Sequence, residues 1–360
     1  MSCGKPAKTG YVTLMVTANV RAQLDPCGWK KNPLGGLSRK SVIVNNYRAE
    51  HKINPVILDA GDTFFASAVL APQNAEGDKK QAEGILQGYE KIGCDALNIG
   101  GFDLAAGKEY LLSLAEGSAI PFISANLTDT EDNLLFPAYT IVENNGFKVG
   151  VIGVSDLIPA HIIDVKKRPY FETANKVIAE IESQVDFVVL LANLQRKQIK
   201  GLAQNFPGAD YIFISRDTQR SRPESKQPEG GPYMYSSGIQ GKYLTVVEIS
   251  LQDPSLPIVD ISTAKGKISS INRRLKKLQE KDPNRTIEEI YADKPNVLKL
   301  VGDYRQQLVK YETIMNDAVN TSIYKSIPLD KNVGENNEVL AFVDETLASC
   351  NALRKKAIIP

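Results

Sequence analysis

Apolar and polar positions alternate along the first two thirds of the chain in a way that predicts strands and helices in turn. Short runs rich in β-branched residues have the character of buried strands, and helical patterns lie between them. This alternation predicts an α/β fold whose sheets are covered on both faces. Asn144-Asn145-Gly146 predicts a hairpin turn. The predicted strands span residues 11–20, 55–58, 95–99, 121–125, 149–154, 187–191 and 211–214, and the predicted helices span 37–50, 79–92, 108–115, 171–184 and 196–205.

The pattern changes after about residue 262, where apolar residues recur at spacings of three and four. One stripe runs from Ile268 to Leu278 and a second from Val297 to Met315, with Pro283 between them. Two narrow stripes of this kind predict an antiparallel helical hairpin. A helix is also expected around residues 337–354. The expected organisation is a tether at 1–10, an α/β domain at 11–262, a helical hairpin at 263–322 and a C-terminal segment at 323–360.

The first helix of the hairpin is basic, because Arg273, Arg274, Lys276 and Lys277 lie together. Such a run is either a solvated helix face or a docking surface, and the sequence leaves both open. The chain as a whole is nearly neutral, with 43 Lys and Arg against 42 Asp and Glu and a net charge of +1. Such a balance gives no general attraction to nucleic acid, so we expect no nucleic-acid partner.

Histidine and cysteine usage narrows the chemistry further. The 360 residues include only two histidines, His51 and His161, which nearly excludes a metal centre built mainly from imidazole. The four cysteines form no C-x-x-C pair. At the start of the chain, Ser2-Cys3-Gly4 resembles a bacterial lipoprotein after signal removal, with Cys3 as the lipidation site. That interpretation predicts a lipid-anchored protein in the periplasm or on the outer cell surface; the alternative is an ordinary cytosolic start.

Several short motifs occur in an order that resembles one family. They include Leu58-Asp59-Ala60-Gly61-Asp62-Thr63-Phe64 and Val149-Gly150-Val151-Ile152-Gly153-Val154. Over about residues 10–260 the chain resembles the N-terminal domain of the 5'-nucleotidase type of calcineurin-like metallophosphoesterase. The resemblance implies a four-layer αββα sandwich with a two-metal site at the strand ends. The remaining matching segments are residues 14–24, 26–29, 33–39, 99–107, 124–127, 186–191 and 207–212.

The C-terminal part resembles a bacterial subgroup of this family, through the helical hairpin and residues 327–330 and 338–344. In that subgroup the phosphoesterase module is often fused to a multihaem cytochrome c segment. The resemblance therefore implies an extracytoplasmic redox assembly, such as one with a multihaem cytochrome, as the partner of this chain.

The family's metal ligands are mostly replaced in this sequence. Its Asp-x-His pair falls on Asn19-Val20-Arg21, its Gly-Asn-His-Glu motif on residues 100–103, and its closing Gly-His-x-His on residues 215–218. Only the bridging aspartate, Asp62, remains. The resemblance thus implies a degenerate site without metal or other cofactor. We call its members the ligand-equivalent positions: Asn19, Arg21, Asp62, Gly101, Phe102, Asp103, Asn193, Arg216 and Thr218.

The two arginines change the electrostatics of such a site. A guanidinium stays protonated and cannot be a metal ligand, and two cations beside two metal ions would be strongly repelled. Arg21 or Arg216 could instead form ion pairs with Asp62, and Asp217 could join them. We expect a salt-bridge cluster in place of the metals; the alternative is that these side chains point to solvent.

Three functions remain open. The first is a catalytically degenerate protein that acts as an exported binding or structural component. The second is a divergent metal-dependent phosphohydrolase or 5'-nucleotidase that holds its metals with other residues. The third is a nucleotide or phosphate binder without turnover, in which Arg21 and Arg216 bind the anion.

Overall fold

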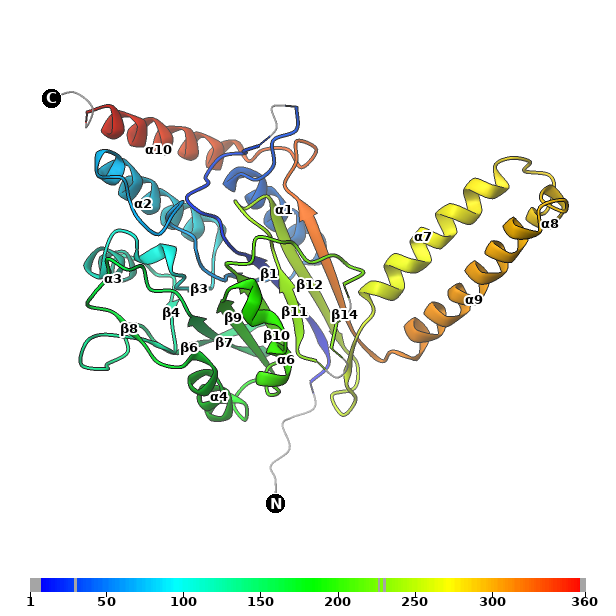
Figure 1. Ribbon diagram of the computed structural model, residues 1–360, viewed down its shortest axis with the longest axis horizontal. Helices are drawn as coiled ribbons and strands as arrows, with labels where there is room; N and C mark the ends of the chain where they lie inside the picture. The colour runs from blue at the N-terminus through cyan, green and yellow to red at the C-terminus, as the bar shows by residue number, and fades with distance from the viewer. Residues whose placement is uncertain (1–7, 29–30, 226, 229–230, 357–360) are drawn as a thin grey trace, which may run out of the picture.

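Two β-sheets packed face to face form the centre of the molecule (Figure 1). The computed structural model describes residues 8–28, 31–225, 227–228 and 231–356; the expected lipidation site, Cys3, lies outside them. The larger sheet has seven strands in the order β13-β14-β12-β1-β2-β3-β4. These strands are β1 (Gly10–Thr17), β2 (Val56–Asp59), β3 (Ala96–Asn98), β4 (Phe122–Ile123), β12 (Tyr243–Leu251), β13 (Ile258–Asp260) and β14 (Asn320–Pro328).

The second sheet has five strands in the order β11-β10-β9-β7-β6. Its antiparallel pair β6–β7 turns at Asn145 and Gly146, whose φ values of 52° and 82° suit the predicted hairpin turn. The strands are β6 (Tyr139–Asn144), β7 (Phe147–Ser155), β9 (Phe187–Asn193), β10 (Tyr211–Ser215) and β11 (Tyr233–Ser236). A further two-stranded ribbon joins β5 (Leu127–Thr128) to β8 (Lys166–Lys167).

Three separate buried clusters show that the two sheets are sandwiched between helices. One lies between the sheets and includes Val16 and Val189. A second lies between the seven-stranded sheet and α1 (Leu37–His51), α2 (Ala75–Ile92) and α10 (Asn337–Lys356). The third lies between the five-stranded sheet and α4 (Tyr170–Ile181), with α6 (Leu202–Asn205). The expected four-layer αββα architecture is therefore confirmed.

Some elements differ from their predicted limits. The helix predicted over residues 196–205 divides into α5 (Arg196–Ile199) and α6, because Gly201 takes a left-handed φ of 80°. The remaining elements are α3 (Lys108–Glu116) and the short 3₁₀ turns η1 (Pro72–Asn74) and η2 (Phe102–Leu104). Among the described residues, no helix combines the length and apolar character needed to cross a membrane.

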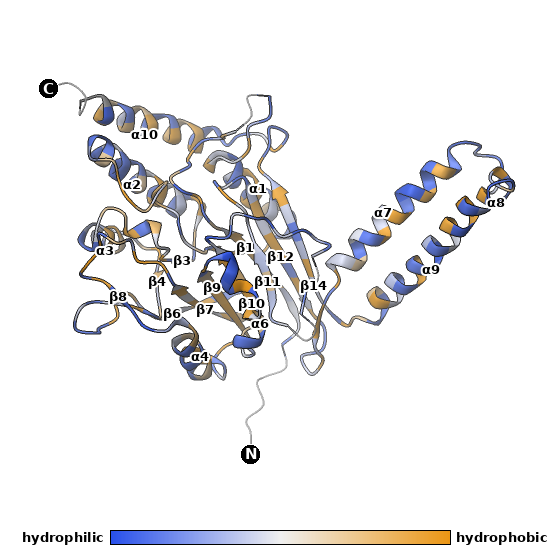
Figure 2. Ribbon diagram, viewed as in Figure 1, coloured by the Kyte–Doolittle hydropathy of each residue, from blue (hydrophilic) through white to orange (hydrophobic). Residues whose placement is uncertain are grey.

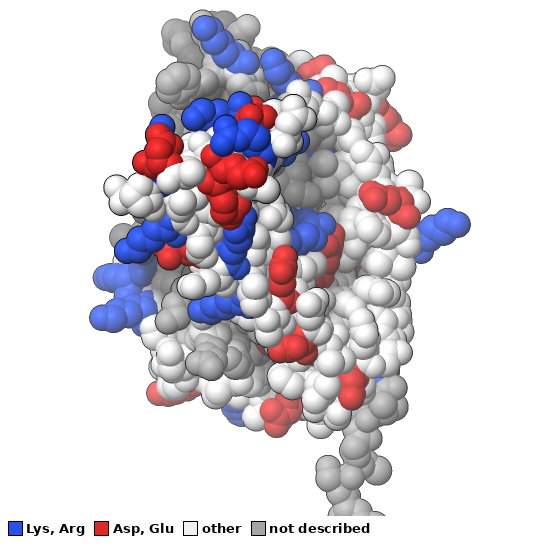
Figure 3. Space-filling model, turned by 90° about the vertical axis from the view of Figure 1, so that its right-hand side faces the viewer, with Lys and Arg blue, Asp and Glu red and all other residues white. Residues whose placement is uncertain are grey.

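The helical hairpin projects from the side of the sandwich (Figure 1). It consists of α7 (Ser262–Gln279), the single turn α8 (Ile287–Ile290) and α9 (Pro295–Asp317). Hydrophobic (orange) and hydrophilic (blue) residues are interspersed along α7 and α9 in Figure 2. Of the two predicted apolar stripes, only Ile271 and Val301 are fully buried. On the face of the molecule in Figure 3, basic and acidic side chains are mixed. A docking role for the basic run stays a prediction.

After the hairpin the chain returns to the central sheet. Strand β14 pairs antiparallel with β12 and parallel with β13. The pattern of apolar residues does not predict this strand, because its buried positions include Asn320 and Ser322 beside Tyr324 and so lack an apolar alternation. The predicted domain limits at residues 262 and 322 stay predictions, but strands from both sides of the hairpin share one sheet.

Aspartates close the amino ends of the parallel strands. Asp95, Asp186 and Asp210 each stand just before a strand, and each accepts a 2.7 Å hydrogen bond from a backbone N–H of the neighbouring strand. The donors are Ile57, Lys148 and Val188. These bonds provide acceptors for backbone N–H groups near the strand ends that would otherwise lack a partner. They also fix three carboxyl groups at the end of the sandwich opposite to the ligand-equivalent positions.

Candidate functional site

The ligand-equivalent positions converge at the carboxyl ends of β1, β2, β3, β9 and β10. Carboxyl ends of parallel strands share one edge of a sheet, which is where α/β proteins place their sites. Contacts also join the two sheets here: the Ser215 hydroxyl donates to the Ala60 carbonyl at 2.6 Å, and the Gly101 N–H donates to Asn193 Oδ1 at 3.2 Å. Eight of the nine positions lie together in this network or against it. Thr218 is exposed farther along the loop that carries Arg216.

The backbone of this site is strained. Of the nine described non-glycine residues with positive φ, five lie here: Asn19, Arg21, Ala22, Asp62 and Arg216, with φ between 53° and 64°. Non-glycine residues in the left-handed region cost of order 1–3 kcal/mol each and concentrate at functional sites. Three backbone hydrogen bonds of 2.9–3.0 Å, from the loop after β1 to the loop after β2, hold this conformation.

Asn19 acts as a structural link between loops. Its Oδ1 accepts the Arg216 backbone N–H at 2.6 Å, and its Nδ2 donates to the carbonyls of Asp217 at 3.0 Å and Gly238 at 2.8 Å. An aspartate at this position could not make the two donor contacts. The replacement of the family's aspartate by Asn19 therefore suits a buried tie between chain segments.

Asp62 is fully buried, and one of its oxygens is without a partner. Oδ1 accepts the Phe102 backbone N–H at 3.0 Å, whereas Oδ2 has no hydrogen-bond partner among the described residues. Burial raises the pKa of Asp62. The hydrogen bonds from Phe102 and Asn193 and the positive charges of Arg21 and Arg216 act in the opposite direction.

Asp103 is bound by its own backbone environment. Four backbone N–H groups, those of Asp62, Thr63, Phe64 and Gly100, donate to its two oxygens at 2.8–3.0 Å. Burial and then the neighbouring charge of Asp62 raise the pKa of Asp103 to about 8. This carboxyl group holds the loops after β2 and β3 together, so its oxygens are already used.

The expected salt-bridge cluster is not what the structure shows. Arg21 lies over the Phe102 ring, with 4.8 Å from its Cζ to the ring centroid, and its Nε is buried without a partner among the described residues. Arg196, not Arg21 or Arg216, pairs with Asp217, at 3.5 Å. Among the described residues no ion pair within 4.0 Å joins Asp62 to either of the two arginines. Burial of Asp62 against Phe102 and Asn193 leaves each guanidinium outside contact distance.

Apolar groups fill the positions of the family's catalytic histidine and of one of its ligands. Phe102 stands where the resemblance places the catalytic histidine, and Gly101 stands where it places an asparagine ligand. Leu157 packs onto Gly101 so closely that an ideal Cβ on residue 101 would lie 2.4 Å from Leu157 Cγ. A larger side chain at residue 101 would require Leu157 to move.

This donor set does not fit the two-metal centre that the family resemblance implies. Two divalent ions need several carboxylates and neutral imidazoles. Within the described ranges, no group of three or more His, Cys, Asp or Glu side chains could hold a metal ion. The two histidines are elsewhere: the His51 ring is tilted against that of Tyr47, with 4.2 Å between the ring centroids, and His161 Nε2 lies 3.3 Å from the Ala105 carbonyl oxygen.

Sequence reasoning missed several polar residues that build the site. Asn98, Ser155 and Ser215 are fully buried at the carboxyl ends of β3, β7 and β10. Asn98 and Ser215 both donate to the Ala60 carbonyl, at 3.0 and 2.6 Å. Their common signal in the sequence is a small polar residue at the end of an apolar strand.

Several proteins of similar sequence are named as nucleotidases or phosphoesterases. No family model matches the chain. It is 27% identical over 185 residues to the 5'-nucleotidase of Vibrio cholerae, covering 48% of this chain and 32% of that protein. It is 22% identical over 347 residues to the trifunctional nucleotide phosphoesterase protein YfkN of Bacillus subtilis, covering 79% of this chain and 23% of that protein. The chain thus spans about a third or less of the length of these relatives.

Solved structures agree on the fold. The calcineurin-like phosphoesterase YfkN of Bacillus subtilis superposes with a TM-score of 0.63 at 15% identity, over 96% of this chain and all of that chain. A 5'-nucleotidase precursor of Thermus thermophilus gives a TM-score of 0.55 at 21% identity, over 68% of this chain and 52% of that one. The expected metallophosphoesterase-like fold is therefore confirmed, and the likeness extends to the fold alone.

Proposed function

We propose that this chain is a catalytically degenerate metallophosphoesterase-fold protein that serves as a binding or structural component. One observation carries the proposal: two positions that should hold metal ligands carry Arg21 and Arg216, Phe102 stands in place of the catalytic histidine, and Leu157 covers Gly101. Neither a guanidinium nor an apolar side chain can be a metal ligand. The positive charges of Arg21 and Arg216 at the same edge of the sheets also oppose the binding of divalent ions.

The relatives are named as nucleotidases and phosphoesterases, which favours the alternative hypothesis that this chain is a divergent phosphohydrolase. Such an enzyme needs metal ligands from residues outside the family pattern. Asp62 could offer Oδ2, but Asp103 is committed to four backbone N–H groups and Asn19 to three backbone groups. The hydrolase reading is therefore the less supported of the two.

A non-hydrolysing anion site is the second candidate. Its support is the Arg216 guanidinium, which makes no hydrogen bond or ion pair with any described residue, and the unpartnered Nε of Arg21. Burial lowers the pKa of Arg216, yet an arginine keeps its charge at neutral pH. Two such groups can bind a phosphate through charge-assisted hydrogen bonds. The strained backbone around these arginines is consistent with a ligand-binding site, because such strain concentrates at functional sites.

Location and partner belong to the proposal as well. A relative of known structure is described as a precursor, which supports an extracytoplasmic place for this chain. A lipid anchor at Cys3 and a multihaem cytochrome as partner rest on the sequence resemblance.

Metal content is the first experiment. The purified protein is incubated with Mn²⁺ and Zn²⁺, desalted and analysed by mass spectrometry, beside the Bacillus subtilis relative as a positive control. We expect less than about 0.1 ion per chain and no hydrolysis of nucleotides, because two-metal catalysis requires both ions. One or two tightly held ions, lost in Asp62→Ala, would overturn the proposal.

The anion site is tested separately by calorimetric titration with inorganic phosphate and AMP. Arg21→Gln and Arg216→Gln should each weaken binding about ten-fold or more, the effect of one charge-assisted contact. Arg305→Gln is the matched control, because Arg305 is paired with Glu288 on the hairpin. Binding that is absent, or unchanged by both arginine variants, would remove this candidate.

A further inference from the structure

Helix α7, the first helix of the hairpin, carries six basic residues and no acidic residue among its 18 residues. The whole chain has a net charge of +1, so the +6 of α7 leaves −5 for the rest of the chain. The acidic residues of the hairpin stand on α8, on α9 and in the turns between the helices. Positive charge is therefore concentrated on one projecting helix. The six residues are Lys265, Lys267, Arg273, Arg274, Lys276 and Lys277.

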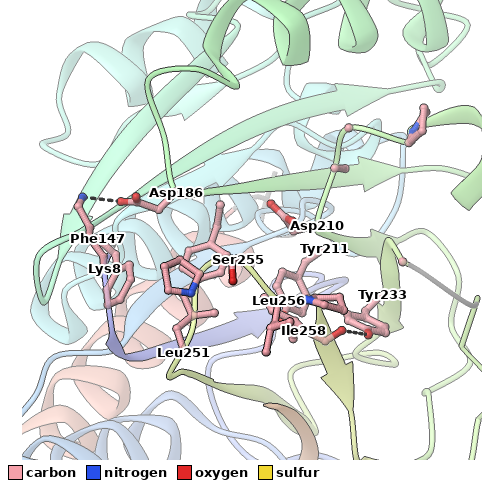
Figure 4. Close-up of a pocket in the computed structure, with 17 residues that line it drawn as sticks. Lys8, Phe147, Asp186, Asp210, Tyr211, Tyr233, Leu251, Ser255, Leu256 and Ile258 are labelled. Atoms are coloured by element: carbon pink, nitrogen blue, oxygen red, sulfur yellow. Dashed lines mark hydrogen bonds and ion pairs between the residues drawn. The ribbon is translucent and has the colours of Figure 1, made fainter. Parts of the chain in front are cut away.

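The charges of α7 are not neutralised by the rest of the molecule. None of the six side chains forms an ion pair with a residue that the structure describes. Arg274 donates to the Tyr304 hydroxyl at 3.0 Å, which is a neutral partner. By contrast, Lys8 lies 2.8 Å from Asp186 Oδ2 beside the cavity of about 690 Å³ in Figure 4, where the two charges cancel. The positive charge of α7 is thus available to a partner outside the chain.

Four of these charges lie on the solvent side of α7, which we call the outer face. At 3.6 residues per turn, each of the four lies at least about 120° around the helix from the buried Ile271. Arg273 precedes Lys276 and Lys277 by three and four residues, spacings at which like charges destabilise a helix. An anionic partner would relieve this repulsion. The outer face consists of the exposed side chains of Lys265, Arg273, Lys276 and Lys277.

The composition of the outer face favours a lipid surface over a protein as the partner. The exposed residues between its charges are Ser269 and Asn272, and it carries no apolar or aromatic side chain. Protein interfaces have an apolar, aromatic-rich centre and are depleted of lysine. A fluid layer of charged head groups needs no such centre. Clusters of four to eight Lys and Arg residues on one helix are typical of segments that bind anionic lipids.

We propose that the outer face of α7 binds the surface of a membrane that contains anionic lipids. The helix lies along the head groups, with its ammonium and guanidinium groups at the level of the phosphates, while its apolar stripe stays packed in the hairpin. The hairpin projects from the sandwich, which leaves α7 accessible to such a surface (Figure 1). The candidate site includes no residue of α7, so this proposal and the proposed function can fail independently.

The test is co-sedimentation of the full chain with phosphatidylcholine vesicles that contain either no phosphatidylglycerol or about 30% of it. The anionic vesicles should bind the protein at least about 100-fold more tightly, because each Lys or Arg near an anionic surface strengthens binding about five-fold. This preference should disappear when the ionic strength rises from about 0.05 to about 0.5 M, because salt screens exposed charges.

A triple variant locates the binding surface. It replaces three charges of the outer face with glutamine, which has a helix propensity close to that of lysine and arginine. Its affinity for the anionic vesicles should fall about 100-fold, and its weak binding to neutral vesicles should not change. The variant is Arg273→Gln/Lys276→Gln/Lys277→Gln.

A second triple variant is the matched control. Lys79→Gln/Lys80→Gln/Lys91→Gln changes three lysines of α2, a helix that also has 18 residues. Each of these lysines is paired with a glutamate. Both triple variants lower the net charge of the chain from +1 to −2, but the control should lose less than about two-fold in affinity, because its lysines are already neutralised.

Three results would each overturn the proposal. They are equal binding to neutral and anionic vesicles, equal losses in the two triple variants, and binding of duplex DNA or polyglutamate in place of the anionic vesicles. The last result would identify a nucleic acid or an acidic protein as the partner. If the first triple variant does not fold in thermal melting, Lys276→Gln and Lys277→Gln decide the matter, each with an expected loss of about five-fold. Both side chains are exposed.

Discussion

The Leu157 side chain occupies the space that a Cβ on residue 101 would need, with 2.4 Å between that Cβ and Leu157 Cγ. Gly101 itself has an ordinary helical backbone, with φ of −64°. The glycine is therefore required by the neighbouring side chain and not by its own conformation. This contact distinguishes a filled site from one that merely lacks its ligands.

Gly101→Ala should consequently destabilise the protein by steric overlap. We expect a loss of about 1–3 kcal/mol in urea unfolding, the usual cost of overpacking a core. The double variant Gly101→Ala/Leu157→Ala should lose less than the sum of the single changes. Gly302→Ala is the control: it lies in α9 with open space around it, and should stabilise the helix by up to about 1 kcal/mol. A Gly101→Ala protein as stable as Gly302→Ala would contradict the close packing.

The raised pKa of Asp103 predicts a pH-dependent stability. Its pKa is about 8 in the folded protein and about 3.9 in an unfolded chain, so between these values the folded state holds one more proton. The stabilisation is fully present below about pH 4 and is lost as pH rises through about 8. The unfolding free energy should fall by up to about 1.4 kcal/mol per pH unit in this window.

The Asp62→Asn variant tests whether the charge of Asp62 contributes to this pH dependence of the unfolding free energy. Asparagine can still accept the Phe102 N–H, but it removes the charge that helps to raise the pKa of Asp103. The substitution also removes the Asp62 carboxyl group, whose own raised pKa contributes to the pH dependence. Urea unfolding across this pH range should therefore show a shallower slope for the variant. Equal slopes would show that the two carboxyl groups are not coupled.

The hydroxyl of Tyr89 should matter more than that of an ordinary buried tyrosine. It donates at 2.7 Å to Asp59 Oδ2, which also accepts the Thr17 hydroxyl, and the Lys40 ammonium lies 4.0 Å from the Tyr89 ring centroid. Tyr89→Phe should cost about 1.5–3 kcal/mol, the range for hydrogen bonds to charged groups. Tyr110→Phe, whose hydroxyl donates to a neutral carbonyl, should cost about 0.5–1.5 kcal/mol by urea unfolding. Equal losses would argue against a charged partner at Asp59.

Removal of the helical hairpin should be tolerated, whereas truncation before it should not. A chain ending at residue 262 loses β14, which leaves β12 as an unpaired edge and removes Tyr324 from its 4.4 Å stack on Tyr235. A chain in which residues 263–318 are replaced by a flexible linker of about ten residues keeps the β13–β14 crossover. We expect a cooperative thermal transition for the second protein and aggregation of the first. A stable truncated protein would show that β14 is dispensable.

Much of the fold could be predicted from the sequence. The apolar runs placed most of the central strands, since a strand buried on both faces is apolar at every position. Strand β14 was missed because two of its buried positions, Asn320 and Ser322, are polar, and Asn320 is held by the backbone N–H groups of Gln252 and Asp253. The helix expected over 196–205 failed for a local reason, the left-handed Gly201, that no periodicity reveals.

The sequence by itself determined that Arg21 and Arg216 stand where the family resemblance places metal ligands and that Phe102 replaces its catalytic histidine. Side-chain chemistry alone excludes all three as metal donors. Only the tertiary structure decided what replaces the metals. The arginines were expected to pair with Asp62, but Arg21 stacks on Phe102 and Asp62 is bound by backbone and amide groups. The reason is geometric: a sequence fixes which charges exist, whereas the packing of loops from five strands fixes which charges come within contact distance.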